Sequence, residues 1–350
     1  STSNFGKIFL LFILILGAFL RLYRIEEMFT FDFDQEVAAN AAYNFIKLGK
    51  LSLIGQELSF QGFFLGPLHN WIQIIPYSIC NLKPDCASYF FTSTGLLSAY
   101  FLYITVKEVI NQKTAMISAL LYLTSSVVIG NERGPSSNYF LFPTSILMLY
   151  CLNKYYKGEK KYLIAGSFFG GLAVINFNPI FIFSLIAFFS AAIFSKKRKI
   201  TVLIISLFAA LANIIPLLIF NFRHQNILLN NLIQFVKEAS STENIISKPF
   251  FIVKDILLPY YNNFLFLNNN IIYEILTFCI LIVGSLLFLK NRKPILIFLL
   301  IWIVFVILGF SFYSRHIPDY YFVQTLLPFI ILTAYLLSKK FSIFIIVISI

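Results

Sequence analysis

The sequence predicts an all-α integral membrane protein, and three observations lead to this fold class. Hydrophobic residues fill 59% of the 350 positions, and the mean hydropathy is +0.83. A soluble domain of this length has no means of burying so much apolar surface, so the bilayer is the expected solvent. The apolar residues also come in runs of roughly the 20 residues that span a membrane, separated by short basic clusters.

Hydropathy places ten spans along the chain. They cover about 7–23, 87–106, 114–130, 138–153, 161–175, 178–195, 200–220, 271–289, 294–313 and 322–338. The stretch from Pro67 to Cys80 is short and interrupted by proline, so we expect it to be re-entrant or to lie in the interface. A further run begins at Phe341 and stops at Ile350, and residue 1 is not Met. We therefore expect one polytopic domain over 1–350, with about 10–12 transmembrane helices, truncated at its C-terminus.

Basic residues fall in very short inner connections when the spans alternate from a cytoplasmic N-terminus. These residues are Lys7, Lys107, Lys113, Lys154, Lys157, Lys160, Lys161, Lys196, Lys197, Arg198, Lys199, Lys290, Arg292, Lys293, Lys339 and Lys340. Short loops rich in Lys and Arg mark the cytoplasmic side of a membrane protein. The basic residues form neither a continuous face nor a tail, so the net charge of +12 does not indicate nucleic-acid binding.

Acidic residues and histidines collect on the opposite, outer side. Only two of the 15 acidic residues fall in the inner connections, and all three histidines are outer. Two long outer segments, about 24–86 and 221–270, carry most of these groups and are too apolar to be disordered. We expect both segments to fold on the membrane surface and to carry the function. Cys80 and Cys86 are also outer and are able to form a disulfide.

The first outer segment opens with an acidic cluster of Asp32, Asp34 and Glu36. From 35–48 apolar residues recur at helical spacing, and Gly49 follows as a C-cap, so an amphipathic surface helix is predicted. Asp34 falls at or beside the N-cap, a common use of Asp that requires no catalysis. Capping explains one carboxylate and not three. The cluster is therefore also a candidate for a general base with an orienting partner, or for a metal site.

The order of several motifs is informative. An Arg-Leu-Tyr-Arg exit from the first span (21–24) precedes the acidic cluster, and Gly66-Pro67-Leu68 follows the surface helix; Arg133, with Asn138 five residues later, and an aromatic-basic segment at 315–321 complete the order. The chain thereby resembles the GT-C superfamily of polytopic glycosyltransferases, in particular the polyprenyl-phosphate-sugar branch that includes protein O-mannosyltransferases and aminoarabinose transferases. The likeness in motifs covers roughly the first 150 residues; beyond them it lies in hydropathy and span count.

The resemblance implies transfer of a sugar from a polyprenyl-phosphate carrier to a lipid, glycan or protein acceptor on the outer face of the cell membrane. Asp34 matches the position of the family's catalytic base. Gln35 stands where Glu is usual, and Glu36 follows one position later, so both Asp32 and Asp34 are open as the base. Attack assisted by one carboxylate, opposite to the leaving group, predicts inversion at the anomeric carbon.

The departing phosphate requires cationic ligands on the outer side, and Arg suits phosphate best. Arg133 and Arg315 rank first because each lies in a short polar loop at the end of a helix. The other candidates for substrate binding are Lys50, His69, Arg223, His224, His316 and Tyr320. For any single outer Arg, snorkelling toward lipid headgroups is the alternative. A divalent metal stays open, although no local ligand spacing supports one, and no other cofactor is indicated.

A transporter or flippase of lipid-linked saccharides is the main alternative function. Transporters are expected to show internal repeats and charged or broken helices near the midplane of the membrane. Here the spans are nearly free of charge, and the second half does not repeat the first. A non-catalytic scaffold is a third reading, because Gln35 replaces the expected acid. The sequence does not indicate which sugar or which acceptor is used.

Overall fold

The computed structural model describes residues 2–58, 62–195, 199–238, 248–266, 270–313 and 316–339. Within these ranges the chain is a helical bundle, and β structure is limited to one isolated antiparallel bridge between Glu57 and Phe64. The predicted all-α class is confirmed. The helices up to residue 156 are α1 (Thr2–Leu22), α2 (Ile25–Met28), α3 (Phe33–Leu48), α4 (Leu68–Ile79), α5 (Cys86–Val109), α6 (Gln112–Thr124), α7 (Ser126–Arg133), η1 (Ser137–Phe140) and α8 (Leu141–Tyr156).

The second half of the chain continues the bundle. Its helices are α9 (Lys161–Asn176), η2 (Pro179–Phe181), α10 (Ile182–Ile193), α11 (Ile200–Leu211), η3 (Ala212–Ile214), α12 (Ile215–Arg223), α13 (Ile227–Glu238), α14 (Lys248–Phe251), η4 (Ile252–Leu257), α15 (Leu258–Phe266), α16 (Ile271–Asn291), α17 (Pro294–Ser311), η5 (Asp319–Phe322) and α18 (Val323–Lys339). Every one of the ten predicted spans falls on a helix or on consecutive helices of this series.

Fewer of these helices meet the length expected for a membrane crossing. Within the described chain, five helices are long and apolar enough to cross, or six if α6 and α7, which are bent by 56°, form one span. Two further apolar helices, Lys161–Asn176 and Pro179–Ile193, are shorter. The apolar window of the span that ends in α18 is 83% buried, whereas that of α16 is 17% buried. Thus α18 lies at the centre of the bundle, and α16 exposes apolar side chains, as a lipid-facing helix does.

Buried hydrogen bonds join the central helices. Trp302 of α17 donates to Ser184 of α10 at 2.6 Å, and Ser184 donates in turn to Gln324 of α18 at 2.7 Å. The ring of Tyr261 stacks on that of Phe329 with centroids 3.8 Å apart. Polar side chains inside an apolar bundle need partners because no water is available to them. These contacts therefore fix the neighbours of α18.

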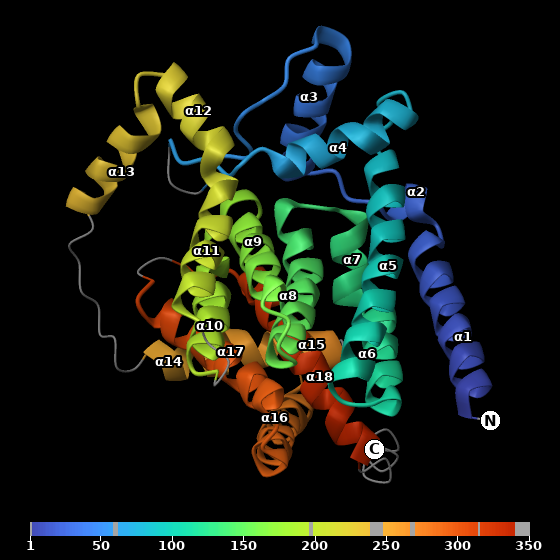
Figure 1. The fold of residues 1–350 in the computed structure, drawn as a ribbon. Coiled ribbons are helices and arrows are strands. Elements are labelled where there is room, and N and C mark those ends of the chain that lie inside the picture. Colours follow the sequence, from blue (N-terminus) through green and yellow to red (C-terminus); the bar gives the residue numbers. More distant parts are fainter. Residues whose placement is uncertain are drawn as a thin grey trace.

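The connections predicted to be cytoplasmic lie together in space. Lys154, in the last turn of α8, and Lys157, directly after that helix, both pair with Glu108 at the end of α5, at 2.9 and 2.6 Å. At the start of α6, Thr114 donates to Ser338 at the end of α18. Helices α3 and α4 cross the opposite end of the bundle (Figure 1, top), away from the N-terminal end of α1. The ends of α5, α8 and α18 and the start of α6 thus lie at one end of the bundle, and α3 and α4 lie at the other.

The predicted surface helix at 35–48 is confirmed as α3, which begins two residues earlier. Gly49 ends it with φ 66°, the left-handed conformation that glycine adopts without strain, as predicted for a C-cap. A small cluster of buried side chains packs beneath α3 and α4; it consists of Ala42, Tyr77, Ala87, Phe91 and Tyr139. This packing anchors α3 to the end of the bundle.

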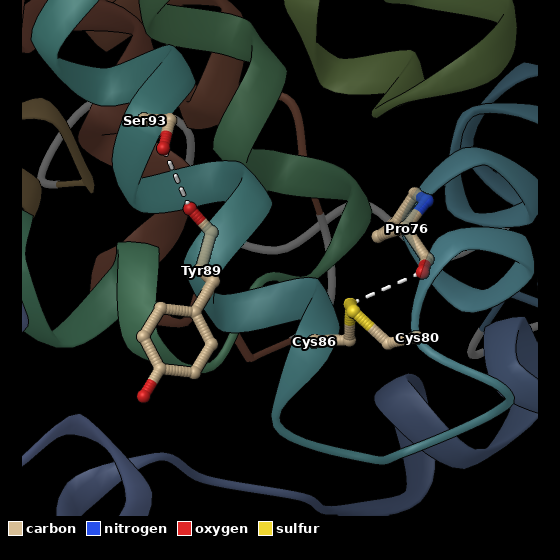
Figure 2. Close-up of a disulfide and its surroundings, with 5 residues drawn as sticks. All are labelled: Pro76, Cys80, Cys86, Tyr89 and Ser93. Atoms are coloured by element: carbon tan, nitrogen blue, oxygen red, sulfur yellow. Dashed lines mark hydrogen bonds between the residues drawn. A yellow bond between two sulfur atoms is a disulfide. The ribbon is translucent and has the colours of Figure 1, made fainter.

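The stretch 67–80, predicted to be re-entrant or interfacial, forms the 12-residue helix α4 with Pro76 inside it. A helix of that length spans about 18 Å, which is too short to cross a bilayer. A disulfide between Cys80 and Cys86 joins the end of α4 to the start of α5 (Figure 2), and the Cys86 sulfur lies 3.1 Å from the carbonyl oxygen of Pro76. Helix α4 is therefore tied to α5 at its C-terminus.

Candidate functional site

A pocket of about 470 Å³ opens beside the N-terminus of α3 and brings together segments from the whole length of the chain. We call it the Asp34 pocket. Its lining combines polar and aromatic side chains, a composition typical of ligand sites. The polar and aromatic residues of the lining include Asp34, Gln56, Glu57, Phe63, Asn138, Phe177, Asn178, Tyr313, Tyr320 and Tyr321.

Asp34 is the half-buried carboxylate of this pocket. Asp32 occupies the N-cap of α3, which places Asp34 in the first helical turn with its side chain in the pocket. The side-chain amide of Gln56 donates to Asp34 Oδ1 at 2.5 Å. Burial raises the pKa of Asp34 above its ordinary value, the Gln56 hydrogen bond opposes that shift, and the charge of Asp32 adds to it. A raised pKa makes a carboxylate a stronger base.

The other two carboxylates of the cluster point elsewhere. Asp32 is exposed at the N-cap, and Glu36 is exposed on α3; neither lines the Asp34 pocket. The capping role that the sequence allowed for Asp34 thus belongs to Asp32. Asp34 therefore does not cap the helix, and its side chain lines the pocket.

Gln35, which stands where the family usually has Glu, has a structural role here. Its side chain is buried; its oxygen accepts the backbone N–H of Asp32 at 2.9 Å, and its amide donates to the carbonyl oxygen of Gly134 at 2.9 Å. A glutamate is unable to make the second bond because its carboxylate has no hydrogen to donate. Gln35 therefore ties the start of α3, and with it Asp34, to the end of α7.

Replacing Gln35 with Ala is expected to lower the free energy of unfolding by about 1–3 kcal/mol, because two buried hydrogen bonds are lost at once. Thermal unfolding in detergent measures this change. The same substitution at exposed Glu36 on the same helix provides the control, with an expected change within about 0.5 kcal/mol. Equal melting temperatures for the two variants would contradict the tethering role.

The wall opposite Asp34 comes from the ends of distant helices. Asn178 donates to the side chain of Asn138 at 2.7 Å and caps η2 by accepting the N–H of Ile180 at 3.0 Å. Tyr320 lies close enough for the charge of Asp34 to act on its hydroxyl. Two of these pocket residues were candidates from the sequence, Asp34 and Tyr320. Asn178 was not among the candidates. It precedes Pro179 at the start of an apolar run, and Asn followed by Pro is a sequence signal for the start of a helix.

Gln56 and Glu57 also line the pocket but were not predicted from the sequence, although they form a polar pair in a segment between glycines. Gly66, farther along that segment, donates to the carbonyl oxygen of Ile175 at 2.7 Å. A Cβ at Gly66 would lie 2.2 Å from the side-chain oxygen of Asn176, so only glycine fits this close approach. The segment is thereby held against the end of α9, with Gln56 facing Asp34.

Arg133 was a leading candidate for the phosphate ligand, and the structure places it away from the Asp34 pocket. Its buried guanidinium donates to three backbone carbonyls at the end of α1: those of Leu20 (2.8 Å), Tyr23 (2.9 Å) and Arg21 (3.3 Å). These carbonyls have no partner within the helix, and a cation at a helix C-terminus also interacts favourably with the helix dipole. Arg133 therefore serves as a cap for α1.

His69 is likewise buried in protein and not in a pocket. Its ring packs against those of Phe91 and Phe140, with centroids about 6.0 and 6.1 Å away, and one ring nitrogen lies 3.4 Å from the amide of Gln73. Burial lowers the pKa of His69 to about 4. The ring is therefore neutral at physiological pH and does not act as a cation for phosphate.

The remaining candidates are dispersed. Arg223 and His224 are exposed at the end of α12, where the His224 ring stacks on Phe220 at 4.0 Å. Lys50 lines a separate pocket of about 530 Å³ between α3 and the segment 50–55. His316 lines another pocket together with Tyr260 and Asp319, and Arg315 lies outside the described residues. Within the described residues, no group of three or more His, Cys, Asp or Glu side chains is arranged to hold a metal ion.

The sequence matches a known protein family in part, and solved structures share the fold. The family model for dolichyl-phosphate-mannose-protein mannosyltransferases matches residues 65–220. ArnT from Cupriavidus metallidurans, solved with undecaprenyl phosphate, superposes with a TM-score of 0.69 at 12% identity over 96% of this chain. The chain has the GT-C fold. The fold that the resemblance implied is thus confirmed.

A second solved structure is also similar in fold. The oligosaccharyltransferase AglB from Archaeoglobus fulgidus, in complex with an inhibitory peptide and a dolichol-phosphate, superposes with a TM-score of 0.57 at 13% identity over 99% of this chain. The chain spans 61% of the length of ArnT and 52% of that of AglB. Among curated proteins, none matches the sequence.

Proposed function

We propose that this protein is a membrane glycosyltransferase that moves a sugar from a polyprenyl-phosphate carrier to an acceptor, with Asp34 as the general base. The observation that carries the proposal is the position of Asp34: half-buried, in a polar and aromatic pocket, at the end of the bundle opposite to the basic connections. The two solved relatives hold polyprenyl phosphates, undecaprenyl phosphate in ArnT and dolichol-phosphate in AglB. Both support the class of donor.

The reaction needs a single base. Two carboxylates line the pocket; Asp34 is half-buried, whereas Glu57 is exposed and accepts the backbone N–H of Gly62. A hydroxyl or amine of the acceptor attacks the anomeric carbon, and its proton passes to Asp34. The bond between that carbon and the phosphate oxygen breaks, and its electron pair leaves with the phosphate. Because attack and departure occur on opposite faces, we expect inversion at the anomeric centre. Tyr320, Asn138 and Asn178 line the pocket, and we expect their polar groups to bind sugar hydroxyls.

The described lining of the Asp34 pocket contains no Lys, Arg or His side chain. For the phosphate ligand we therefore retain Arg315 as a prediction from the sequence. In the chain it lies between Tyr313 and Tyr320, and both of these line the pocket. Arginine offers two parallel donors to phosphate oxygens and stabilises the charge that develops as the bond breaks.

We place the Asp34 pocket on the non-cytoplasmic face of the cell membrane, with the N-terminus of the chain inside. The positive-inside pattern supports this orientation, since the basic connections gather at the other end of the bundle. The Cys80–Cys86 disulfide supports it independently. Disulfides persist in oxidising compartments outside the cytosol.

The test of this function is an assay of the purified protein in lipid nanodiscs with a panel of polyprenyl-phosphate sugars, run with and without a chelator. The expected result is release of free polyprenyl phosphate from at least one donor. If no donor is consumed and the labelled lipid instead moves between leaflets of proteoliposomes, the transporter alternative holds. The chelator arm determines whether a divalent metal is required.

Activity is expected to fall in acid with an apparent pKa above the ordinary aspartate value of 3.8, because burial raises the pKa of Asp34. Only the ionised carboxylate accepts a proton, so kcat/KM drops about tenfold per pH unit below that pKa. A pH–rate profile, with thermal unfolding measured over the same range, tests this expectation. An acid limb at or below pH 3.8 in a folded protein would contradict it.

A further inference from the structure

One wall of the Asp34 pocket is a short antiparallel ribbon, formed by residues 55–58 and 62–65. Backbone hydrogen bonds join its two sides. The N–H of Leu65 donates to the carbonyl oxygen of Gln56 at 2.9 Å, and that of Leu58 donates to the carbonyl oxygen of Phe63 at 2.7 Å. Five residues of this pocket ribbon line the Asp34 pocket: Gln56, Glu57, Leu58, Phe63 and Leu65. Its position therefore sets the shape of the pocket.

Helices α12 and α13, from the second outer segment, contact the pocket ribbon at two points. The side-chain amide of Asn231 in α13 donates to the carbonyl oxygen of Gly62 at 3.0 Å. The ring of Phe220 in α12 lies beside that of Phe64, with centroids 6.4 Å apart. Both helices lie at the end of the bundle that carries α3 and α4 (Figure 1). Neither Asn231 nor Phe220 lines the Asp34 pocket, so these contacts act on the ribbon and not on a ligand.

Gly62 is held through both of its backbone polar groups. Its N–H donates to Glu57 Oε1 at 2.6 Å, and its carbonyl oxygen accepts the hydrogen bond from Asn231. The approach is close, because a Cβ at position 62 would lie 2.2 Å from the amide nitrogen of Asn231. Asn231 is thus bonded to the residue that also fixes the Glu57 side chain.

The turn between α12 and α13 holds Asn231 in place. Asn221 is buried; its side-chain oxygen accepts the N–H groups of Leu228 at 3.0 Å and Leu229 at 3.2 Å, and its amide donates to Asn226 Oδ1 at 3.0 Å. The first N–H groups of a helix have no partner within that helix, so Asn221 caps α13. Asn231 lies in the next turn and is therefore presented to Gly62 from a fixed helix end.

The pocket ribbon leads from these contacts to the carboxylate of the proposed base. Gln56 belongs to the ribbon, and its side-chain amide donates to Asp34 Oδ1 at 2.5 Å. A hydrogen bond to a carboxylate favours the ionised form, so this bond lowers the pKa of Asp34 against the effect of burial. A displacement of the ribbon therefore alters both the pocket wall and the environment of Asp34.

We propose that Asn231 is a positioning residue, which holds the pocket ribbon through Gly62 and thereby keeps Gln56 bonded to Asp34. The effect on sugar transfer rests on the proposed function. The tether between Asn231 and the ribbon does not depend on turnover and is measured separately.

Hydrogen–deuterium exchange on the full chain in nanodiscs measures the tether. Asn231→Ala should raise the exchange rate of the ribbon amides about three- to tenfold, the effect of one hydrogen bond. Asn230→Ala is the matched control: it makes the same change at the neighbouring position of α13, where the side chain is exposed, and should leave ribbon exchange as in the wild type. Unchanged exchange in Asn231→Ala, equal effects of the two variants, or faster exchange throughout the chain would overturn the proposal.

The pH dependence of transfer separates positioning from a general loss of stability. Asn231→Ala should lower kcat/KM about three- to tenfold and move the acid limb of its pH–rate profile to higher pH, because a weaker Gln56 bond leaves the pKa of Asp34 higher. Asn230→Ala should leave both unchanged. In the described chain, the titratable groups around Asp34 are the same in both variants: Asp32, Glu57, Tyr313, Tyr320 and Tyr321. An acid limb that does not move in Asn231→Ala would contradict the role of Gln56 as the link.

A double variant tests that link directly. Gln56→Leu should move the acid limb upward by about one pH unit or less, and by at least as much as Asn231→Ala. Adding Asn231→Ala to Gln56→Leu should move it no further, since the bond to Asp34 is already absent. Additive shifts would overturn the proposal. If no donor is ever consumed, the proposed function fails, and the exchange result alone decides whether Asn231 holds the ribbon.

Discussion

Asp34→Asn is expected to abolish sugar transfer, with a loss on the order of 10²-fold to 10⁴-fold, while the protein still folds and inserts. General base catalysis by a positioned carboxylate contributes about that much, and asparagine has no basic oxygen of comparable strength. The substitution keeps the shape of the side chain. Polyprenyl phosphate release in the nanodisc assay measures the loss.

The same variant should be as stable as the wild type or more stable at neutral pH. The pKa of Asp34 is raised in the folded protein, so its ionised form is disfavoured there relative to the unfolded chain. That cost is present above the native pKa, and asparagine removes it. Asp32→Asn and Glu36→Gln serve as controls and should retain transfer, because neither side chain lines the pocket. Full activity of Asp34→Asn, or loss only in Asp32→Asn, would contradict the assignment.

Glu132→Gln is expected to have the largest effect on stability, about 3–5 kcal/mol. Glu132 pairs with Arg21 at 2.5 Å, with side-chain exposures of 1% and 0%. Arg21 also donates to the carbonyl oxygen of Leu123 at 2.7 Å, and Tyr122 donates to Glu132 at 2.9 Å. Removing the carboxylate leaves the arginine charge buried without a counter-ion. Thermal unfolding in detergent detects the change.

Two comparisons isolate the buried pair. Glu27→Gln breaks the exposed pair between Arg24 and Glu27, with exposures of 56% and 59%, and should cost about 0–1 kcal/mol. A double variant, Arg21→Met with Glu132→Leu, should recover most of the stability lost in Glu132→Gln, since apolar packing replaces the pair. Similar melting temperatures for Glu132→Gln and Glu27→Gln would contradict the role of the buried pair in joining α1 to α7.

The sequence predicted those parts of the fold that depend on local pattern. Each of the ten spans predicted from hydropathy falls on a helix or on consecutive helices, because an apolar run has few alternatives to a helix in a bilayer. The number of crossings was overestimated, since five or six helices of the described chain are long and apolar enough to cross. The spacing of apolar residues predicted α3, and Gly49 predicted its C-terminal end. Charge alternation separated the end that carries Glu108 and its lysines from the end that carries Asp34.

The roles of single polar residues were harder to predict because they depend on partners distant in sequence. Arg133 looked like a free outer arginine, but the end of α1 packs beside it, and three backbone carbonyls there accept hydrogen bonds from its guanidinium. His69 looked accessible in an outer segment, but Phe91 and Phe140 enclose its ring. No local pattern reveals these contacts.

The acidic cluster illustrates both outcomes. The sequence left open which carboxylate caps the helix, and the structure has Asp32 at the N-cap and Asp34 in the lining of the pocket. Catalysis by Asp34 stays a prediction. The substitution at Gln35 suggested a lost active site from sequence alone. Its hydrogen bond to Gly134 gives it a structural reason instead.

The central claim is that the sugar donor binds in the Asp34 pocket. Photo-crosslinking with a polyprenyl-phosphate sugar that carries a photoreactive group on the sugar tests it most directly, with the attachment sites mapped by mass spectrometry. We predict attachment to the peptides that contain Asp34, Gln56 or Tyr320, and competition by unlabelled donor. Attachment only elsewhere, for example near Lys50 or on α16, would contradict the claim.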